Sequence, residues 1–208
     1  MPSSAMLTDV TLTGAHVRLE PLSPVHVPAL VEVGLDPSLW TISLTRLETP
    51  DDVRRYVEAA LRERAAGQSL PFATVHAPSG RVVGSTRFGN VDLANRHVEI
   101  GWTWVAPAWQ RTAVNTEAKY LMLRHAFETL GCMRVELKTD VLNARSRAAI
   151  LRLGAKEEGV FRKHMLAHGG RVRDTIWFSV IDDEWPGVKA RLEARLDARL
   201  ASEARAVL

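Results

Sequence analysis

Residues 99–117, E-I-G-W-T-W-V-A-P-A-W-Q-R-T-A-V-N-T-E, combine a strand pattern with an anion-binding loop. Ile100, Trp102 and Trp104 recur at every second position, which predicts a strand with these three side chains on one face. The strand ends at a proline, and a polar loop over residues 110–115 leads directly into a helix. The backbone N–H groups of such a loop and the positive end of the helix dipole bind phosphate. The stretch therefore predicts an enzyme that uses a phosphate-bearing cofactor.

The elements that must position this stretch form one continuous α/β domain without repeats or linkers. Thr49 followed by Pro50 is a typical helix start, and Asn143 is expected to cap a second helix. A Pro-Ser-Gly turn at residues 78–80 indicates an antiparallel meander around the loop. Strands are expected at residues 11–22, 72–76, 81–88, 97–106, 134–139, 156–165 and 172–181, and helices from 23, 49, 112, 143 and 184.

Composition places the chain among ordinary globular proteins. It has 208 residues, 46% of them hydrophobic and 25% charged, and it contains no apolar run of the length that a membrane helix needs. The N-terminus shows neither the basic nor the apolar region of a signal peptide. Cys132 is the single cysteine, so a disulfide within the chain is excluded, and its place between a helix end and a strand indicates a buried structural role. We expect a cytoplasmic protein without a membrane partner.

Charge is unevenly distributed along the chain. The net charge is +3, with nine basic and 11 acidic side chains in residues 1–100 and 18 basic and 13 acidic ones in residues 101–208. The basic half contains the anion-binding loop, which fits a small polyanionic cofactor better than a nucleic acid. His164 and His168 have the spacing of zinc ligands on a helix, but they run into a Gly-Gly turn with no cysteine nearby. We predict no metal site and no nucleic-acid partner.

The C-terminal segment, residues 187–208, is predicted to be an amphipathic helix. Val188, Leu192, Leu196 and Leu200 recur at four-residue spacing beside a row of arginines. This pattern indicates a helix packed on the domain with its arginines in solvent. The alternative is a contact between the two copies of a homodimer.

The ordered set of motifs resembles the GNAT acetyltransferase superfamily, in particular the branch of the ribosomal-protein N-terminal alanine and serine acetyltransferases. The resemblance covers residues 10–186, which would be the acetyltransferase domain. It implies an α/β (α+β) fold with a mixed, mostly antiparallel sheet flanked by helices and with splayed central strands that hold acetyl-CoA. The motifs are E-I-G-W-T-W-V-A-P-A-W-Q-R-T, T-D-V-L-N-A-R-S-R-A-A-I-L-R-L-G-A, E-G-V-F-R-K-H and R-D-T-I-W-F-S-V.

The resemblance also implies roles for individual residues, with acetyl-CoA as donor and a primary amine as acceptor. The pantetheine arm would pair with Thr103, Trp104 and Val105, with the Val105 N–H polarising the thioester carbonyl. Asn143 would bind the pantetheine or a water, and Ser146 would protonate the leaving thiolate. The pyrophosphate would lie on the backbone amides of Gln110, Arg111, Thr112, Ala113, Val114, Asn115 and Thr116.

The phosphate loop departs from the pattern of that superfamily, because it contains no glycine. Glycine permits a positive φ and a close approach of the backbone to phosphate. Among the residues present, Asn115 tolerates the left-handed conformation better than most, and Arg111 could compensate by contacting phosphate directly. A second departure is Ile150, which stands where many members of the superfamily have a tyrosine that acts as the general acid. A non-catalytic module that binds acyl-CoA or a protein is therefore the alternative function.

Four further side chains are candidates for chemistry or acceptor binding. Glu99 could take the proton of the attacking amine through a water, unless it is a surface carboxylate paired with Arg87 or Arg96. His97 is the runner-up base on the same face. Trp40, in the irregular segment 35–48, is expected to contact the acceptor, whether a protein N-terminus or a small amine. The other candidates for acceptor binding are Arg87 and Trp102.

Overall fold

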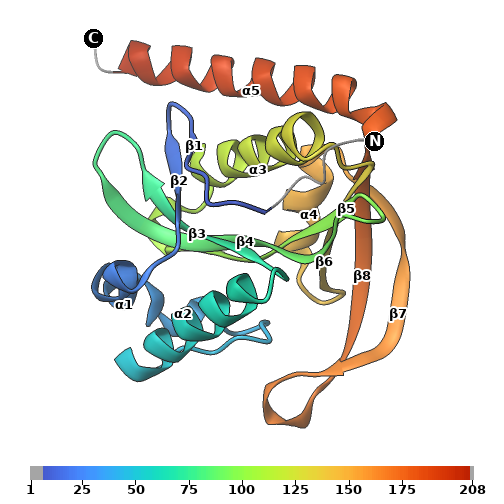
Figure 1. The fold of residues 1–208 in the computed structure, drawn as a ribbon. Helices are drawn as coiled ribbons and strands as arrows, with labels where there is room; N and C mark the ends of the chain where they lie inside the picture. The colour runs from blue at the N-terminus through green and yellow to red at the C-terminus, as the bar shows by residue number, and fades with distance from the viewer. Residues whose placement is uncertain (1–6, 207–208) are drawn as a thin grey trace.

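An eight-stranded sheet runs through the computed structural model, which describes residues 7–206 (Figure 1). The strand order is β1-β2-β3-β4-β5-β6-β8-β7, and every neighbouring pair is antiparallel except β5 and β6. The predicted mixed, mostly antiparallel sheet is thus confirmed. The strands are β1 Leu12–Thr13, β2 Val17–Pro21, β3 Leu70–His76, β4 Arg81–Asp92, β5 His97–Val105, β6 Arg134–Asp140, β7 Lys156–Leu166 and β8 Val172–Ile181.

Helices cover both faces of the sheet and create two cores (Figure 1). The larger core lies against α3 (Val114–Arg124), α4 (Ala144–Leu153) and α5 (Trp185–Ala206), and we call this side of the sheet the α3 face. The smaller core lies against α1 (Val27–Gly34) and α2 (Pro50–Ala65), on what we call the α2 face. Val188, Leu192 and Leu196 bury the apolar side of α5 in the larger core. None of the helices in residues 7–206 is long and apolar enough to span a bilayer.

The helix boundaries follow the capping signals in the sequence. The Thr49 hydroxyl accepts a hydrogen bond from the Asp52 amide at 3.2 Å, which starts α2 as predicted. The Asn143 side chain accepts one from the Ser146 amide at 3.0 Å and starts α4. Gly154 ends α4 in the left-handed region, at φ 99°. The predicted helix over residues 112–130 is divided, since α3 continues after Arg124 as a π-helical turn, His125–Thr129.

The single strand predicted over residues 11–22 is wrong, because the chain turns back at residues 14–16 to form the hairpin β1–β2. The buried carboxylate of Glu117, from the first turn of α3, accepts hydrogen bonds from the amides of Ala15, His16 and Val17. These three amides donate to the Glu117 carboxylate and not to a neighbouring strand. Glu117 is about 100 residues away in sequence, so a local pattern cannot reveal the contact.

A one-residue bulge in β5 overturns the predicted common face of Ile100, Trp102 and Trp104. Gly101 pairs with Arg87 and Trp104 pairs with Ser85, so three steps on β5 match two on β4. The extra residue is Trp102, at φ 49°. Ile100 consequently lies in the core of the α3 face, whereas Trp104 lies in the core of the α2 face.

The two central strands separate after a short parallel contact. β5 and β6 pair only over His97–Arg134, Val98–Val135 and Glu99–Glu136. Beyond these pairs, β5 continues through its bulge and β6 continues to Asp140 without further pairing between them. This opening, which we call the splay, confirms the splayed central strands expected from the family resemblance. Glu99 marks its closed end, and Val105 leads from its open end toward the loop over residues 110–115.

Candidate functional site

Glu99 lies at the closed end of the splay and is almost completely buried, with 2% of its surface exposed. Its Oε2 atom is 2.8 Å from Nζ of Lys138 on β6 and accepts a hydrogen bond from the Asn90 amide nitrogen at 2.6 Å. The alternative of a surface carboxylate paired with Arg87 or Arg96 is therefore wrong. A buried, hydrogen-bonded carboxylate at this position has the geometry to exchange a proton with a group that enters the splay.

Lys138 bridges the splay and is surrounded by aromatic rings. Its Nζ lies 4.7 Å from the centroid of the Trp177 ring and 6.0 Å from that of Trp102. Both distances are within the range of cation–π attraction. The ammonium group of a β6 residue is thus held by a carboxylate and an indole from β5 and by a second indole from β8. Neither Lys138 nor Trp177 was among the sequence candidates, because strands distant in sequence bring them to Glu99.

Trp102 and Arg87 form a layer beside this ion pair. The Arg87 guanidinium carbon lies 5.1 Å from the ring centroids of both Tyr56 and Trp102. Arg87 is buried and donates to Glu63 at 2.8 Å, whereas Trp102 is about one-third exposed. A ligand can therefore reach Trp102 but not Arg87, whose guanidinium packs against the Trp102 ring.

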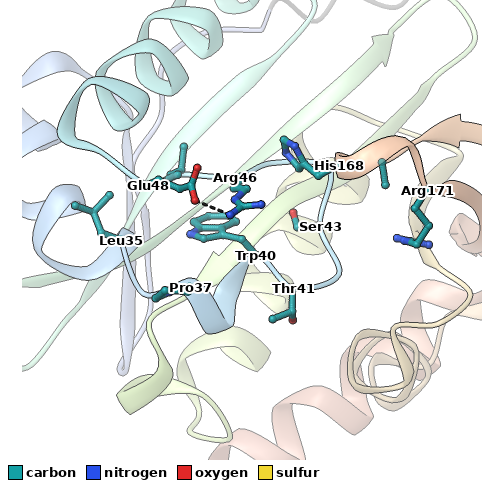
Figure 2. Close-up of a pocket in the computed structure, with 12 residues that line it drawn as sticks. Leu35, Pro37, Trp40, Thr41, Ser43, Arg46, Glu48, His168 and Arg171 are labelled. Atoms are coloured by element: carbon teal, nitrogen blue, oxygen red, sulfur yellow. Dashed lines mark hydrogen bonds and ion pairs between the residues drawn. The ribbon is translucent and has the colours of Figure 1, made fainter.

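A cavity of about 580 Å³ lies between the segment over residues 35–48 and the tip of the β7–β8 hairpin. Figure 2 shows Trp40 at the cavity wall, with Arg46 paired to Glu48 near it and with His168 and Arg171 on the hairpin side. Trp40 is 7% exposed, donates to the Gly34 carbonyl and packs edge-on against Trp104 at 5.6 Å. One edge of a core indole thus lines the cavity.

The loop over residues 110–115 reaches a left-handed conformation without glycine, at Arg111. Arg111 has φ 62°, whereas Ala113 has φ −69° and Asn115 lies inside α3. The left-handed residue is thus Arg111 and not Asn115, although Asn115 tolerates this conformation better by residue type, and the Cβ of Ala113 causes no conformational strain. Thr112 accepts from the Val114 amide and donates to the Trp109 carbonyl, which ties the loop to the helix start.

The loop is also fastened to the end of β5 and to α4. Gln110 donates to the Val105 carbonyl at 2.9 Å and accepts from Arg145 on α4 at 2.7 Å. Arg111 is exposed. The backbone N–H groups in the first turn of an α-helix have no acceptor inside the helix, and in α3 these include the N–H groups of Asn115 and Thr116. A preformed loop, a helix N-terminus and an exposed guanidinium together fit a pyrophosphate.

Asn143 and Ser146 lie at the start of α4, beside the segment 38–42. Asn143 lines a smaller cavity of about 310 Å³ with Ser38, Thr41 and Ile42. Its Oδ1 is engaged in the helix cap, so a ligand would meet its amide nitrogen instead. Ser146 is half-buried, and Ile150 is buried in the larger core.

A buried lysine anchors the other side of the bulge. Lys119 on α3 donates to Thr103 at 2.5 Å and to Thr86 at 2.9 Å, and these hydroxyls lie 2.7 Å apart. Thr103 is therefore positioned from the α3 face. Lys119 and Glu117 escaped the sequence analysis. Their signal in the sequence is two opposite charges that lie two positions apart near the start of the helix.

Burial lowers the pKa of Lys119 to about 7, and we predict a pH-dependent stability from this shift. In the unfolded chain this lysine has its ordinary pKa of 10.5, so between pH 7 and 9 the unfolded chain binds more protons than the folded chain. Stability therefore rises with pH, by about 2 kcal/mol over this interval. Urea unfolding at both pH values should show this rise in the wild type and its loss in Lys119→Met. Equal pH dependence in the two proteins would contradict the prediction.

Two other chemistries have little support in residues 7–206. Burial raises the pKa of the Cys132 thiol to about 11, so the thiol is not ionised near neutral pH and is a poor nucleophile. No group of three or more metal-binding side chains occurs in the described part of the chain. His97, the alternative base, lies at the start of β5 with its Nε2 3.5 Å from Asp92.

Comparison with known proteins agrees with this arrangement. Residues 16–156 match the family model described as "Acetyltransferase (GNAT) domain". The chain is 34% identical over 110 residues to the "Putative ribosomal N-acetyltransferase YdaF" of Bacillus subtilis (strain 168), a match that spans 53% of this chain and 59% of that relative. A GCN5-related N-acetyltransferase from Brucella melitensis superposes with a TM-score of 0.84 at 33% identity, over 90% of this chain and 85% of that one. RimJ of Mycobacterium smegmatis, in complex with CoA-disulfide, gives 0.73 at 25% identity, over 89% and 91%.

Proposed function

We propose that this chain, which belongs to the GNAT acetyltransferase family and is an acyltransferase, moves acetyl from acetyl-CoA to a primary amine. The amine attacks the thioester directly, in a ternary complex of protein, acetyl-CoA and acceptor. The observation that carries the proposal is the splay itself. It has a buried carboxylate at its closed end and a preformed anion-binding loop beyond its open end.

The donor would be held along the splay by backbone groups. The amides of residues 110–116 would take the pyrophosphate, with Arg111 adding a charge-assisted contact. The pantetheine would pair with the free edge of β5 at Thr103, Trp104 and Val105, as an added strand does. Asn143 would meet the arm from the α4 side. GNAT acetyltransferases use acetyl-CoA as the donor, which supports this assignment.

Glu99 would act as the general base and Ser146 as the proton source for the leaving group. An acceptor amine attacks only after losing a proton, which Glu99 takes directly or through a water. The C–N bond forms as the thioester C–S bond breaks, and the thiolate leaves. Because free thiols have a pKa of about 8.5, a weak acid such as Ser146 or water is sufficient there.

The acceptor would enter from the α2 face, through the cavity lined by Trp40 and the β7–β8 tip, and meet Trp102 above Glu99. The name of the Bacillus relative, a putative ribosomal N-acetyltransferase, favours a ribosomal protein N-terminus over a small amine. An N-terminal amine of this kind would be available in the cytoplasm, where we expect the protein to act.

The test is a thermal-shift titration with acetyl-CoA. A ligand at 100 times its Kd adds about 2.7 kcal/mol of stability, which for a chain of this size raises Tm by about 5–10 °C. Adenosine 3′,5′-bisphosphate is the matched ligand, and we expect a smaller shift because it lacks the pantetheine. No shift with acetyl-CoA at millimolar concentration would overturn the proposed function.

A further inference from the structure

The ammonium of Lys138 already occupies the environment that a primary-amine acceptor requires. A carboxylate lies 2.8 Å away, and two indole faces lie at 4.7 and 6.0 Å. Lys138 stands on β6, two residues beyond the last pair with β5, so its side chain crosses the splay to reach Glu99. About 18% of that side chain is exposed, so it is not locked in the core.

The other four lysines of the chain have different surroundings. Lys119 is sealed among hydroxyl groups on the α3 side of β5. Lys156 and Lys189 pair with Glu184 and Glu128, away from the splay. Lys163 lies on the exposed edge strand β7. Lys138 alone among them contacts the carboxylate to which we assign the base role.

We propose that Lys138 is a site of self-acetylation, in which the protein acetylates its own side chain from acetyl-CoA. The inference rests on the proposed function, since it requires the thioester to lie in the splay. The Lys138 ammonium gives a proton to Glu99, and its nitrogen forms a bond to the acetyl carbon. The nitrogen loses its second proton as the C–S bond breaks, and CoA leaves as a thiolate that takes up this proton through water. Glu99 then releases its proton to solvent. No further reactant is needed.

Acetylation of Lys138 has a direct consequence for the site. The amide product carries no charge, so the ion pair with Glu99 is lost and the cation–π contacts with the two indoles end. An external amine competes for the same carboxylate and the same donor. A good acceptor therefore protects Lys138, and the modification accumulates when acetyl-CoA is present without one.

The experiment is incubation of the full chain with acetyl-CoA in the absence of acceptor, followed by intact-mass measurement and peptide mapping. We expect one acetyl group at Lys138, at a rate independent of protein concentration because the reaction is intramolecular. Glu99→Gln should slow this modification at least tenfold. Lys138→Arg should remove it, while the matched Lys156→Arg variant leaves it unchanged. Exposed lysines such as Lys163 report the chemical background, which should be equal in the wild type and Glu99→Gln.

The thermal-shift titration distinguishes a failure of self-acetylation from a failure of the proposed function. If acetyl-CoA raises Tm and an amine releases thiol while Lys138 stays unmodified, self-acetylation is wrong and the proposed function stands. If Lys138 is modified equally fast in Glu99→Gln, the reaction is ordinary chemical acetylation, and the inference is also wrong. If acetyl-CoA does not bind, the proposed function fails and the inference fails with it.

Discussion

Glu99→Gln is expected to lower kcat by about 100-fold or more, the usual contribution of a general base. Glutamine has nearly the same shape and can still accept from Asn90 and Lys138, so the fold and donor binding should be retained. The measurement is thiol release from acetyl-CoA with a panel of primary amines and N-terminal peptides, together with the acetyl-CoA thermal shift for each variant.

Glu136→Gln is the matched control for this measurement. Glu136 is the residue that pairs with Glu99 in the register of β5 and β6, but its carboxylate binds Arg134 at 2.9 Å. We expect a change of less than twofold in kcat for this control. A comparably small change in Glu99→Gln would remove the base role from Glu99, and His97 would then become the next candidate.

The sequence predicts the elements of this fold well because their signals are local. Thr49 and Asn143 cap the helices that they were expected to cap, and Gly154 ends α4. The turn at residues 78–80 joins β3 to β4 as the meander requires. In each case the decisive hydrogen bonds or backbone angles involve residues within a few positions of one another, so their pattern is visible in a short window.

The parts that sequence analysis missed depend on contacts between distant segments. A bulge at Trp102 changes which face Trp104 occupies, and no alternation pattern shows where a strand gains a residue. Lys138 reaches Glu99 only because β6 lies beside β5. Asn115 tolerates the left-handed conformation by residue type, but the start of α3 places it in the helix, and Arg111 makes the turn of the loop instead.

Glu117 couples the same loop to the edge of the sheet, and its removal should have the largest effect on stability. Its carboxylate accepts from the amides of Ala15, His16 and Val17 at 3.0, 2.7 and 2.7 Å. A Cβ at Gly14 would lie 2.4 Å from the same carboxyl group, so the turn is fitted closely around it. A single charge thus satisfies three backbone donors that would otherwise be left without an acceptor.

We expect Glu117→Ala to lower the free energy of unfolding by roughly 2–6 kcal/mol, since the His16 and Val17 amides are buried and each buried donor without an acceptor costs about 1–3 kcal/mol. Glu117→Gln keeps one acceptor oxygen and should lose about half as much. Glu48→Ala, which removes an exposed carboxylate paired with Arg46, should cost less than about 1 kcal/mol. The measurement is urea unfolding of the three variants and the wild type.

The functional consequence follows from the position of Glu117 in the first turn of α3. If the hairpin no longer holds that turn, the amides of residues 110–116 lose their fixed direction, and acetyl-CoA should raise the Tm of Glu117→Gln by less than it raises that of the wild type. A loss of stability below about 1 kcal/mol in Glu117→Ala would show that water replaces the carboxylate at these amides. In that case the hairpin β1–β2 would be held by its core residues, Leu12, Val17 and Leu19, and not by the charge on α3.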